Sequence, residues 1–216
     1  MFFKDNLNDV RTAKGFTLVE LLIVIAILAI LAAAVVVVIN PGQLLAQARD
    51  AQRLNDLPAV RDALALFIAQ STPSATLLGD AIACATPFRT SSTVAITSAT
   101  SPFTATVSTA IITAANVRTT AGAGWVGARL NDMPGGSPLS ILPIDPINDA
   151  TFFYAFACNN PAVTFELAGR LEAERNRAIM INDGGNRNTC PPAATPLVAT
   201  DSTCFWELGT DPGLDM

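Results

Sequence analysis

The sequence predicts an α+β protein, in which a long N-terminal helix, first hydrophobic and then amphipathic, packs on a small head built on an antiparallel β-sheet. Three observations support this fold class. Residues 21–39 form an uncharged apolar run, residues 41–70 show an amphipathic pattern, and residues 151–168 contain two strand-like segments. Half of the 216 residues are hydrophobic and 14% are charged. This composition excludes an intrinsically disordered chain and is too apolar for an average soluble enzyme.

The apolar run is long enough to cross a membrane. As a helix with a rise of about 1.5 Å per residue, it spans roughly 28 Å, close to the thickness of a hydrocarbon core. Lys4, Arg11 and Lys14 precede the run, and positive charge on that side favours a cytoplasmic N-terminus with the remaining chain outside. The alternative is a cleaved secretory signal peptide. The run is longer than a typical signal core, although the alanines at positions 32–34 resemble a small-residue cleavage site.

The segment KGFTLVELLIVIAILAILAAA, at positions 14–34, resembles the N-terminus of type IV pilins and type II secretion pseudopilins. In that family a prepilin peptidase cuts between the glycine and the phenylalanine and then N-methylates the new terminus. By position, the resemblance implies cleavage between Gly15 and Phe16 and N-methylation of Phe16. It also implies a role in filament assembly for Glu20, the glutamate five residues into the mature chain.

Glu20 is an ionisable group at the start of an otherwise uncharged span. A carboxylate in a bilayer costs roughly 2.5–3.5 kcal/mol on insertion scales, so we expect it to have a partner. Cleavage creates one, the α-amine of Phe16, which normally titrates near pH 8. The two groups are four residues apart, so pairing within one chain is an alternative. The family resemblance implies pairing between neighbouring subunits.

We predict four segments along the chain: a leader peptide at 1–15, a transmembrane and filament-core helix at 16–40, an amphipathic helix at 41–70 that continues into the head, and an extracytoplasmic globular head at 71–216.

Two prolines interrupt the helical pattern. We expect a kink or a loosened turn near residues 37–41, because Pro41 lacks a backbone donor. We expect Pro58 either to kink the second helix or to start a new segment capped by Asn55 or Asp56. The charged side chains of this helix are predicted to form a solvated face, with contacts between subunits as the alternative; they are Arg49, Asp50, Arg53, Asp56, Arg61 and Asp62.

The head is predicted to contain a β-hairpin. Residues 151–157 (TFFYAFA) and 163–168 (VTFELA) are strand-like and are separated by CNNP, which has turn chemistry. Residues 86–120 are rich in Ser, Thr and Ala, with β-favouring runs at 93–97 and 106–113. They form either short strands and loops or a mobile surface insertion.

Four cysteines lie on the extracytoplasmic side in this topology: Cys84, Cys158, Cys190 and Cys204. An even number in an oxidising compartment indicates disulfides. A zinc site of four thiolates is the alternative, but the sequence has no CxxC pair. Three pairings are possible, and we favour Cys190–Cys204 with Cys84–Cys158. The first closes a loop of about 15 residues, worth roughly 3 kcal/mol, and pilins often close a C-terminal loop in this way.

We expect no cofactor. Calcium is the alternative, because the DGGN sequence at 183–186 with Asp132, Asp145 and Asp149 could supply oxygen ligands. Major pseudopilins of type II secretion bind calcium in a C-terminal loop. This sequence lacks EF-hand spacing, however, and DGGN is equally a tight turn.

The remaining polar and aromatic groups have simple interpretations. Glutamates at 166, 172 and 174 alternate with a cluster of arginines, which predicts a salt-bridged surface; the arginines are Arg170, Arg175, Arg177 and Arg187. With a net charge of −5, we do not expect nucleic-acid binding. Trp125 and Trp206 are expected to pack in the core or in turns. The chain has no histidine, the most common general base, so we expect no enzyme and no catalytic residue.

The resemblance therefore implies a structural subunit of a type IV pilus-like filament made of identical subunits. It also implies the partners: the prepilin peptidase, an assembly ATPase and an inner-membrane platform protein. It would be a single-pass membrane protein before assembly and part of a cell-surface or periplasmic filament afterwards. One alternative is a type II secretion pseudopilin. Another is a membrane-anchored adhesion or binding module, which would need neither the Gly-Phe junction nor the glutamate.

Overall fold

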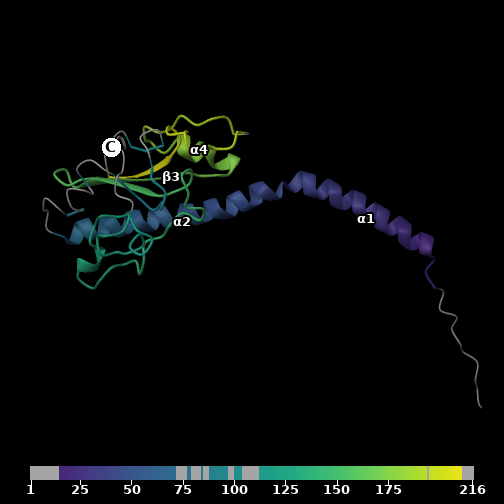
Figure 1. The fold of residues 1–216 in the computed structure, drawn as a ribbon, viewed down its shortest axis with the longest axis horizontal. Helices are drawn as coiled ribbons and strands as arrows, with labels where there is room; N and C mark the ends of the chain where they lie inside the picture. Colours follow the sequence, from purple (N-terminus) through teal and green to yellow (C-terminus); the bar gives the residue numbers. More distant parts are fainter. Residues whose placement is uncertain are drawn as a thin grey trace, which may run out of the picture. The chain divides into compact units, whose positions relative to one another are not determined.

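The computed structural model describes residues 15–71, 77–78, 84, 88–96, 100–103, 112–193 and 195–210. The chain forms two compact units, Met1–Pro41 and Gly42–Met216. Helix α1 (Leu18–Ile39) belongs to the first unit, and α2 (Pro41–Gln70) leads into the second (Figure 1). The basic residues of the predicted leader lie outside the described residues, as do positions 106–111 of the second β-favouring run.

The break between the two helices falls at Asn40, within the predicted region. Asn40 has a φ of 46° and lies in the left-handed region, where it ends α1. Asparagine tolerates this conformation better than most residues, because its short side chain can hydrogen-bond locally. Proline follows at the first position of α2, where its missing N–H has no helical partner to lose. The Asn-Pro pair therefore ends one helix and begins the next.

Helix α2 packs one face against the head. Its buried apolar side chains are Ala46, Leu57, Val60, Ala63, Leu64 and Phe67. The helix runs through Pro58, so the expected new segment capped by Asn55 or Asp56 is wrong. Asn55 instead donates from Nδ2 to the carbonyl of Ala51 (2.7 Å), one turn earlier in the same helix. Burial of apolar side chains on both sides of Pro58 outweighs the missing hydrogen bond.

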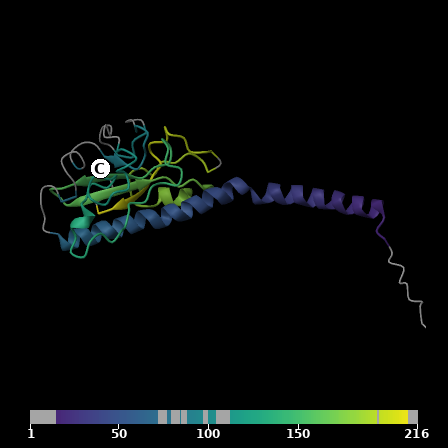
Figure 2. The same cartoon turned by 60° about the horizontal axis from the view of Figure 1, so that its bottom comes forward.

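The sheet is antiparallel throughout, with the strand order β1-β2-β3-β4. Its strands are β1 (Arg89–Thr90), β2 (Ala155–Asn159), β3 (Thr164–Gly169) and β4 (Trp206–Gly209). Three short helices complete the regular elements that the structure describes beyond α2: η1 (Leu130–Asp132), η2 (Glu174–Asn176) and α4 (Arg177–Ile181). The sheet covers α2 on one side, as a second view of the head shows (Figure 2).

The predicted hairpin is confirmed as β2 and β3, in which Cys158 lies opposite Phe165. Strand β2 begins at Ala155 instead of residue 151, because Asp149 Oδ1 accepts hydrogen bonds from the amides of Thr151 and Phe152 and holds a turn there. Residues 93–96 form no strand either. Their chain turns at Ser92, whose hydroxyl accepts from the amide of Val94 (3.0 Å), a local bond that competes with sheet pairing.

Two apolar clusters lie on the two faces of the sheet, as the alternation of a strand requires. Phe156, Phe165 and Leu167 point to the cluster that includes the buried face of α2. Ala155 and Ala168 point to the second cluster, which contains Phe88, Ile96, Phe103, Phe153 and Phe205. The prediction that the tryptophans pack in the core or in turns is confirmed, because Trp125 is fully buried and Trp206 is 7% exposed.

Two disulfides cross-link the head. Cys84 is bonded to Cys158 and Cys190 to Cys204, the two pairs that the sequence analysis favours. The first reaches β2, and the second closes the loop that precedes β4.

Candidate processing and assembly site

The predicted cleavage site lies in an exposed, non-helical segment. Gly15, Phe16 and Thr17 precede the first turn of α1, and the Phe16 side chain is 81% exposed. Apart from Gly15 itself and its chain neighbours, no described heavy atom lies within 4 Å of the position that a Cβ on Gly15 would occupy. A protease requires such an accessible, extended peptide, so the geometry suits cleavage between Gly15 and Phe16.

Glu20 caps its own helix in the uncut chain. Thr17 Oγ1 accepts a hydrogen bond from the amide of Glu20 (3.2 Å), and Glu20 Oε2 accepts from the amide of Thr17 (2.9 Å). The Thr17 hydroxyl also donates to Glu20 Oε2 (2.8 Å). This reciprocal arrangement is a capping box. The sequence analysis missed it, although Thr17 and Glu20 have the S/T-x-x-E spacing that signals one.

The capping box fixes the carboxylate beside the N-terminal end of α1, where the helix dipole stabilises negative charge. In the uncut chain the nitrogen of Phe16 is a peptide amide. The pairing of Glu20 with the α-amine that cleavage would create therefore stays a prediction.

Helix α1 is apolar all round and exposed all along. Its residues Leu18–Val36 have a mean hydropathy of 3.1 and none of them is buried. Its large apolar side chains range from 47% exposed at Val24 to 83% at Val38. A helix without a polar face is stable when lipid or other apolar helices surround it. The length and composition of α1 allow it to cross a membrane.

The comparison with known families matches this segment. Residues 10–36 match the family model of the prokaryotic N-terminal methylation motif. The chain carries the type IV pilin and pseudopilin signature. No curated protein and no solved structure matches the chain.

The pilin-like signature has direct consequences. It implies processing by a prepilin peptidase and filament assembly in general. The apolar helix that carries it fits the membrane anchor of a pilin precursor. The architecture agrees, because an N-terminal apolar helix is followed by a second helix and a four-stranded antiparallel sheet, as in the expected α+β, pilin-like fold.

A buried ionic network ties α2 of this pilin-like chain to its head. Arg53 donates from Nε and Nη2 to the two carboxylate oxygens of Asp145 (2.7 and 2.9 Å) and from Nη1 to Asp50 (2.9 Å). All three side chains are at most 1% exposed. Burial acts to lower the pKa of Arg53, but the hydrogen bonds and charges of Asp145 and Asp50 outweigh it, so the pKa is raised. The prediction of a solvated charged face is wrong at these positions.

Asp50 extends the network to the segment after β3. Its carboxylate accepts hydrogen bonds from the amides of Glu172 (2.7 Å) and Ala173 (2.8 Å) and from Asn176 Nδ2 (2.7 Å). Arg49 forms a two-point ion pair with the Glu172 carboxylate (2.7 and 2.5 Å). The sequence gives no signal for these contacts, because their partners are more than ninety positions apart.

The arginine cluster is not the predicted salt-bridged surface. Arg170 is fully buried, lies over the ring of Phe205 at 4.1 Å, and has a pKa lowered by burial to about 10. Its guanidinium donates to backbone carbonyls instead of carboxylates; the acceptors are Thr151, Val198, Ala199, Asp201 and Cys204. These carbonyls mostly belong to the Cys190–Cys204 loop, where no strand ladder satisfies them and a buried acceptor needs a donor.

The structure does not bring the candidate calcium ligands together. Asp145 binds Arg53, Asp132 pairs with Arg129 (2.8 Å), and Asp149 caps a turn. Asp183 accepts from the amides of Gly185 (3.0 Å) and Glu207 (2.8 Å). In the part of the chain that the structure describes, no three His, Cys, Asp or Glu side chains form a group that could hold a metal ion.

Two buried glutamates lie on adjacent strands. The prediction of a surface position is wrong for the first, Glu166, and the sequence analysis did not consider the second, Glu207. Glu166 on β3 and Glu207 on β4 are each 1% exposed and share one face of the sheet. Glu207 Oε2 accepts from the amide of Arg187 (2.9 Å). Burial raises the pKa of Glu207 to about 7, and the charge of Asp183 adds to the shift, while hydrogen bonds from the Arg187 amide and from Glu166 oppose it.

Proposed function

We propose that the mature chain, starting at Phe16, is a structural subunit of a type IV pilus-like filament that polymerises through α1. The observation that carries the proposal is an apolar helix exposed on all sides directly after an accessible Gly-Phe junction. Such a helix is stable in the membrane before assembly and among neighbouring copies of α1 afterwards.

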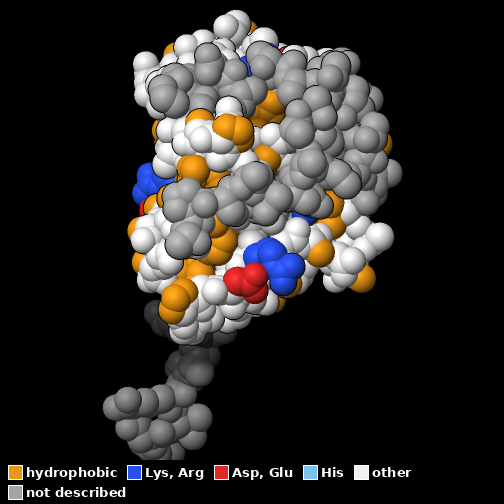
Figure 3. Space-filling view, turned by 90° about the vertical axis from the view of Figure 1, so that its left-hand side faces the viewer, with side chains coloured by type: hydrophobic (Ala, Val, Ile, Leu, Met, Phe, Trp, Pro, Cys, Tyr) orange, Lys and Arg blue, Asp and Glu red, His pale blue; other side chains and the backbone are white. Residues whose placement is uncertain are grey.

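The surface of the head supports polymerisation through α1. On the face shown in Figure 3, the hydrophobic atoms of the described residues form small groups, as on most soluble domains. Among the described residues, α1 in contrast exposes a continuous apolar surface.

Two features favour a pilus over a secretion pseudopilus. A disulfide closes the C-terminal loop at Cys190–Cys204, an arrangement that resembles pilins. Asp145 and Asp183, which could have served a calcium loop, are engaged by Arg53 and by backbone amides. The expected partners are the prepilin peptidase, the assembly ATPase, the inner-membrane platform protein and further copies of the chain. We propose no enzymatic role, and the alternative of a membrane-anchored binding module does not account for the junction.

The test of assembly uses two variants of the capping box, one that removes the charge of Glu20 and one that removes the capping hydroxyl of Thr17. Glu20→Gln removes the charge but keeps the capping geometry, because glutamine can occupy the same position of the box. Thr17→Ala removes the capping hydroxyl, at a cost of about 1 kcal/mol, but keeps the charge. We expect Glu20→Gln subunits to be cleaved normally and to enter filaments at least about tenfold less than wild type, since removing one partner of a buried ion pair costs about 3–5 kcal/mol. We expect Thr17→Ala subunits to assemble.

The measurement is the ratio of variant to wild-type subunits in sheared filaments from mixed expression, by mass spectrometry and electron microscopy. Peptides that begin at Phe16 verify cleavage. Wild-type incorporation of Glu20→Gln would refute charge pairing, and an equal defect in both variants would show that Glu20 acts by capping. A cleaved wild-type chain that yields no filaments under any assembly machinery would refute the proposed function itself.

A further inference from the structure

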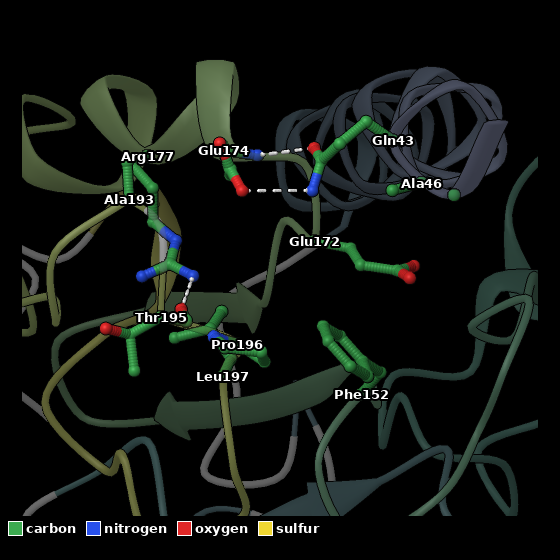
Figure 4. A pocket seen from close by; sticks show the side chains of 11 residues that line it. Gln43, Ala46, Phe152, Glu172, Glu174, Arg177, Ala193, Thr195, Pro196 and Leu197 are labelled. Carbon is green, nitrogen blue, oxygen red and sulfur yellow. Dashed lines mark hydrogen bonds between the residues drawn. The ribbon is translucent and has the colours of Figure 1, made fainter. Parts of the chain in front are cut away.

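A pocket of about 310 Å³ lies in the head, where the first turns of α2 meet the segment around η2 and α4 and the Cys190–Cys204 loop. None of its lining residues belongs to the N-terminal segment, and the filament role gives it no task. Polar side chains line one side of the hollow, and apolar side chains form its floor (Figure 4).

Glu174 presents a carboxylate to the pocket in a fixed orientation. Gln43 donates from Nε2 to Glu174 Oε1 (3.3 Å) and accepts from the amide of Glu174 at Oε1 (3.2 Å), so one amide group holds both ends of the glutamate (Figure 4). Glu174 takes part in none of the ion pairs among the described residues. The neighbouring Glu172 differs, because Arg49 pairs with its carboxylate.

Arg177 contributes a positive charge from another side of the pocket. The residue is 5% exposed, and its Nη1 and Nη2 donate to the carbonyls of Pro191 (2.8 Å) and Thr195 (2.6 Å). Its Nε has no acceptor, and it takes part in no ion pair among the residues that the structure describes. Burial lowers the pKa of Arg177, but a guanidinium stays charged in proteins. The charges of Asp201 and Glu174 oppose this shift, but neither carboxylate forms an ion pair with Arg177 among the described residues. An anion in direct contact with the guanidinium would therefore be stabilised.

The floor of the pocket is apolar and the volume is small. Phe152, Pro196 and Leu197 lie below the polar groups (Figure 4). The guanidinium carbon of Arg53 lies over the Phe152 ring, 4.9 Å from its centroid. Ligand pockets usually measure about 300–1,000 Å³. A volume at the lower limit restricts the ligand to roughly the size of one amino acid.

We propose that this pocket binds a free α-amino acid with an apolar side chain. The ligand carboxylate lies toward Arg177, its ammonium group toward Glu174, and its side chain over Phe152 and Leu197. The two charges of the pocket are opposite, and neither forms an ion pair with the other or with another described residue. This arrangement matches a zwitterion better than a ligand with a single charge. Charge-assisted hydrogen bonds supply the affinity.

The test measures binding to the full mature chain in detergent by calorimetry, with three matched probes. L-Leucine carries both charges, N-acetyl-L-leucine lacks the ammonium group and L-leucinamide lacks the carboxylate. We expect leucine to bind with a Kd below about 1 mM and each analogue to bind at least about tenfold more weakly. No saturable binding of leucine, or equal binding of leucine and either analogue, would overturn the proposal.

A variant pair assigns the site. Glu174→Gln keeps the shape and the contact with Gln43, and we expect it to weaken leucine binding at least about tenfold while leaving N-acetyl-L-leucine unchanged. Arg175→Gln is the matched control, because Arg175 is exposed and lies outside the pocket lining; it should leave all three affinities unchanged. Unchanged leucine binding by Glu174→Gln would refute the assignment. Filament assembly is scored separately, and its outcome does not bear on the pocket.

Discussion

Removal of one charge from the buried network should greatly lower the free energy of unfolding of the head. Asp145→Asn keeps the shape of the side chain but removes the charge of the carboxylate that Arg53 contacts at two points. Arg53 keeps the carboxylates of Asp50 (2.9 Å) and Glu172 (3.5 Å). Both side chains of the pair are at most 1% exposed, so water cannot replace the lost partner. Breaking a buried ion pair in this way costs about 3–5 kcal/mol. In a unit of this size that corresponds to a fall in Tm of roughly 6–20 °C.

A double variant distinguishes the loss of the Arg53–Asp145 ion pair from the cost of leaving Arg53 without that partner. Arg53→Met in the Asp145→Asn background removes the cation that has lost its two-point partner, and Asp50 keeps its three other donors. We therefore expect the double variant to be more stable than Asp145→Asn alone, because an apolar replacement of a buried pair is often neutral. Arg61→Met is the control, since Arg61 and Asp62 form an exposed pair worth about 0–1 kcal/mol.

The assay is urea unfolding of the mature chain in detergent, followed by the fluorescence of the buried tryptophans at positions 125 and 206. A loss of less than about 1 kcal/mol for Asp145→Asn would refute the view that the network attaches α2 to the head.

Three further predictions concern other parts of the chain. Raising the pH from about 4.5 to about 7 should lower the free energy of unfolding by up to roughly 1.4 kcal/mol per pH unit through Glu207. The reason is that the raised pKa of Glu207 means that the folded state binds the proton more tightly than the unfolded state. Glu207→Gln should remove this pH dependence in urea titrations, and an unchanged dependence would contradict the assignment. Replacing Cys190 and Cys204 by serine should cost about 3 kcal/mol, and an unchanged urea midpoint would show that the loop needs no cross-link. Cleavage before Phe16 should remove both lysines of the chain, so an amine-reactive dye should label the side chains of the precursor and leave those of the filament subunit unlabelled; lysine labelling in filaments would mean that cleavage had failed.

The hairpin and the helices show which elements local sequence patterns can predict. The alternation of β2 and β3 and the turn chemistry between them were sufficient to predict their pairing. The start of β2 was misplaced, because Asp149 competes for the first amides of that segment. Pro58 misled the helix prediction for the opposite reason, since packing of α2 against the sheet overrides the local penalty.

The N-terminal segment was determined by the sequence alone. The predicted roles of Gly15, Phe16 and Glu20 rest on the order of these residues along the chain, and the capping box joins residues three positions apart. Only the tertiary structure decided that Arg53 and Arg170 are buried, which acceptors they bind, and that Glu174 and Arg177 line one pocket. A charged residue has the same local pattern whether it faces water or a distant partner. Its environment is fixed when the folded chain brings that partner within hydrogen-bonding distance and removes the water between them.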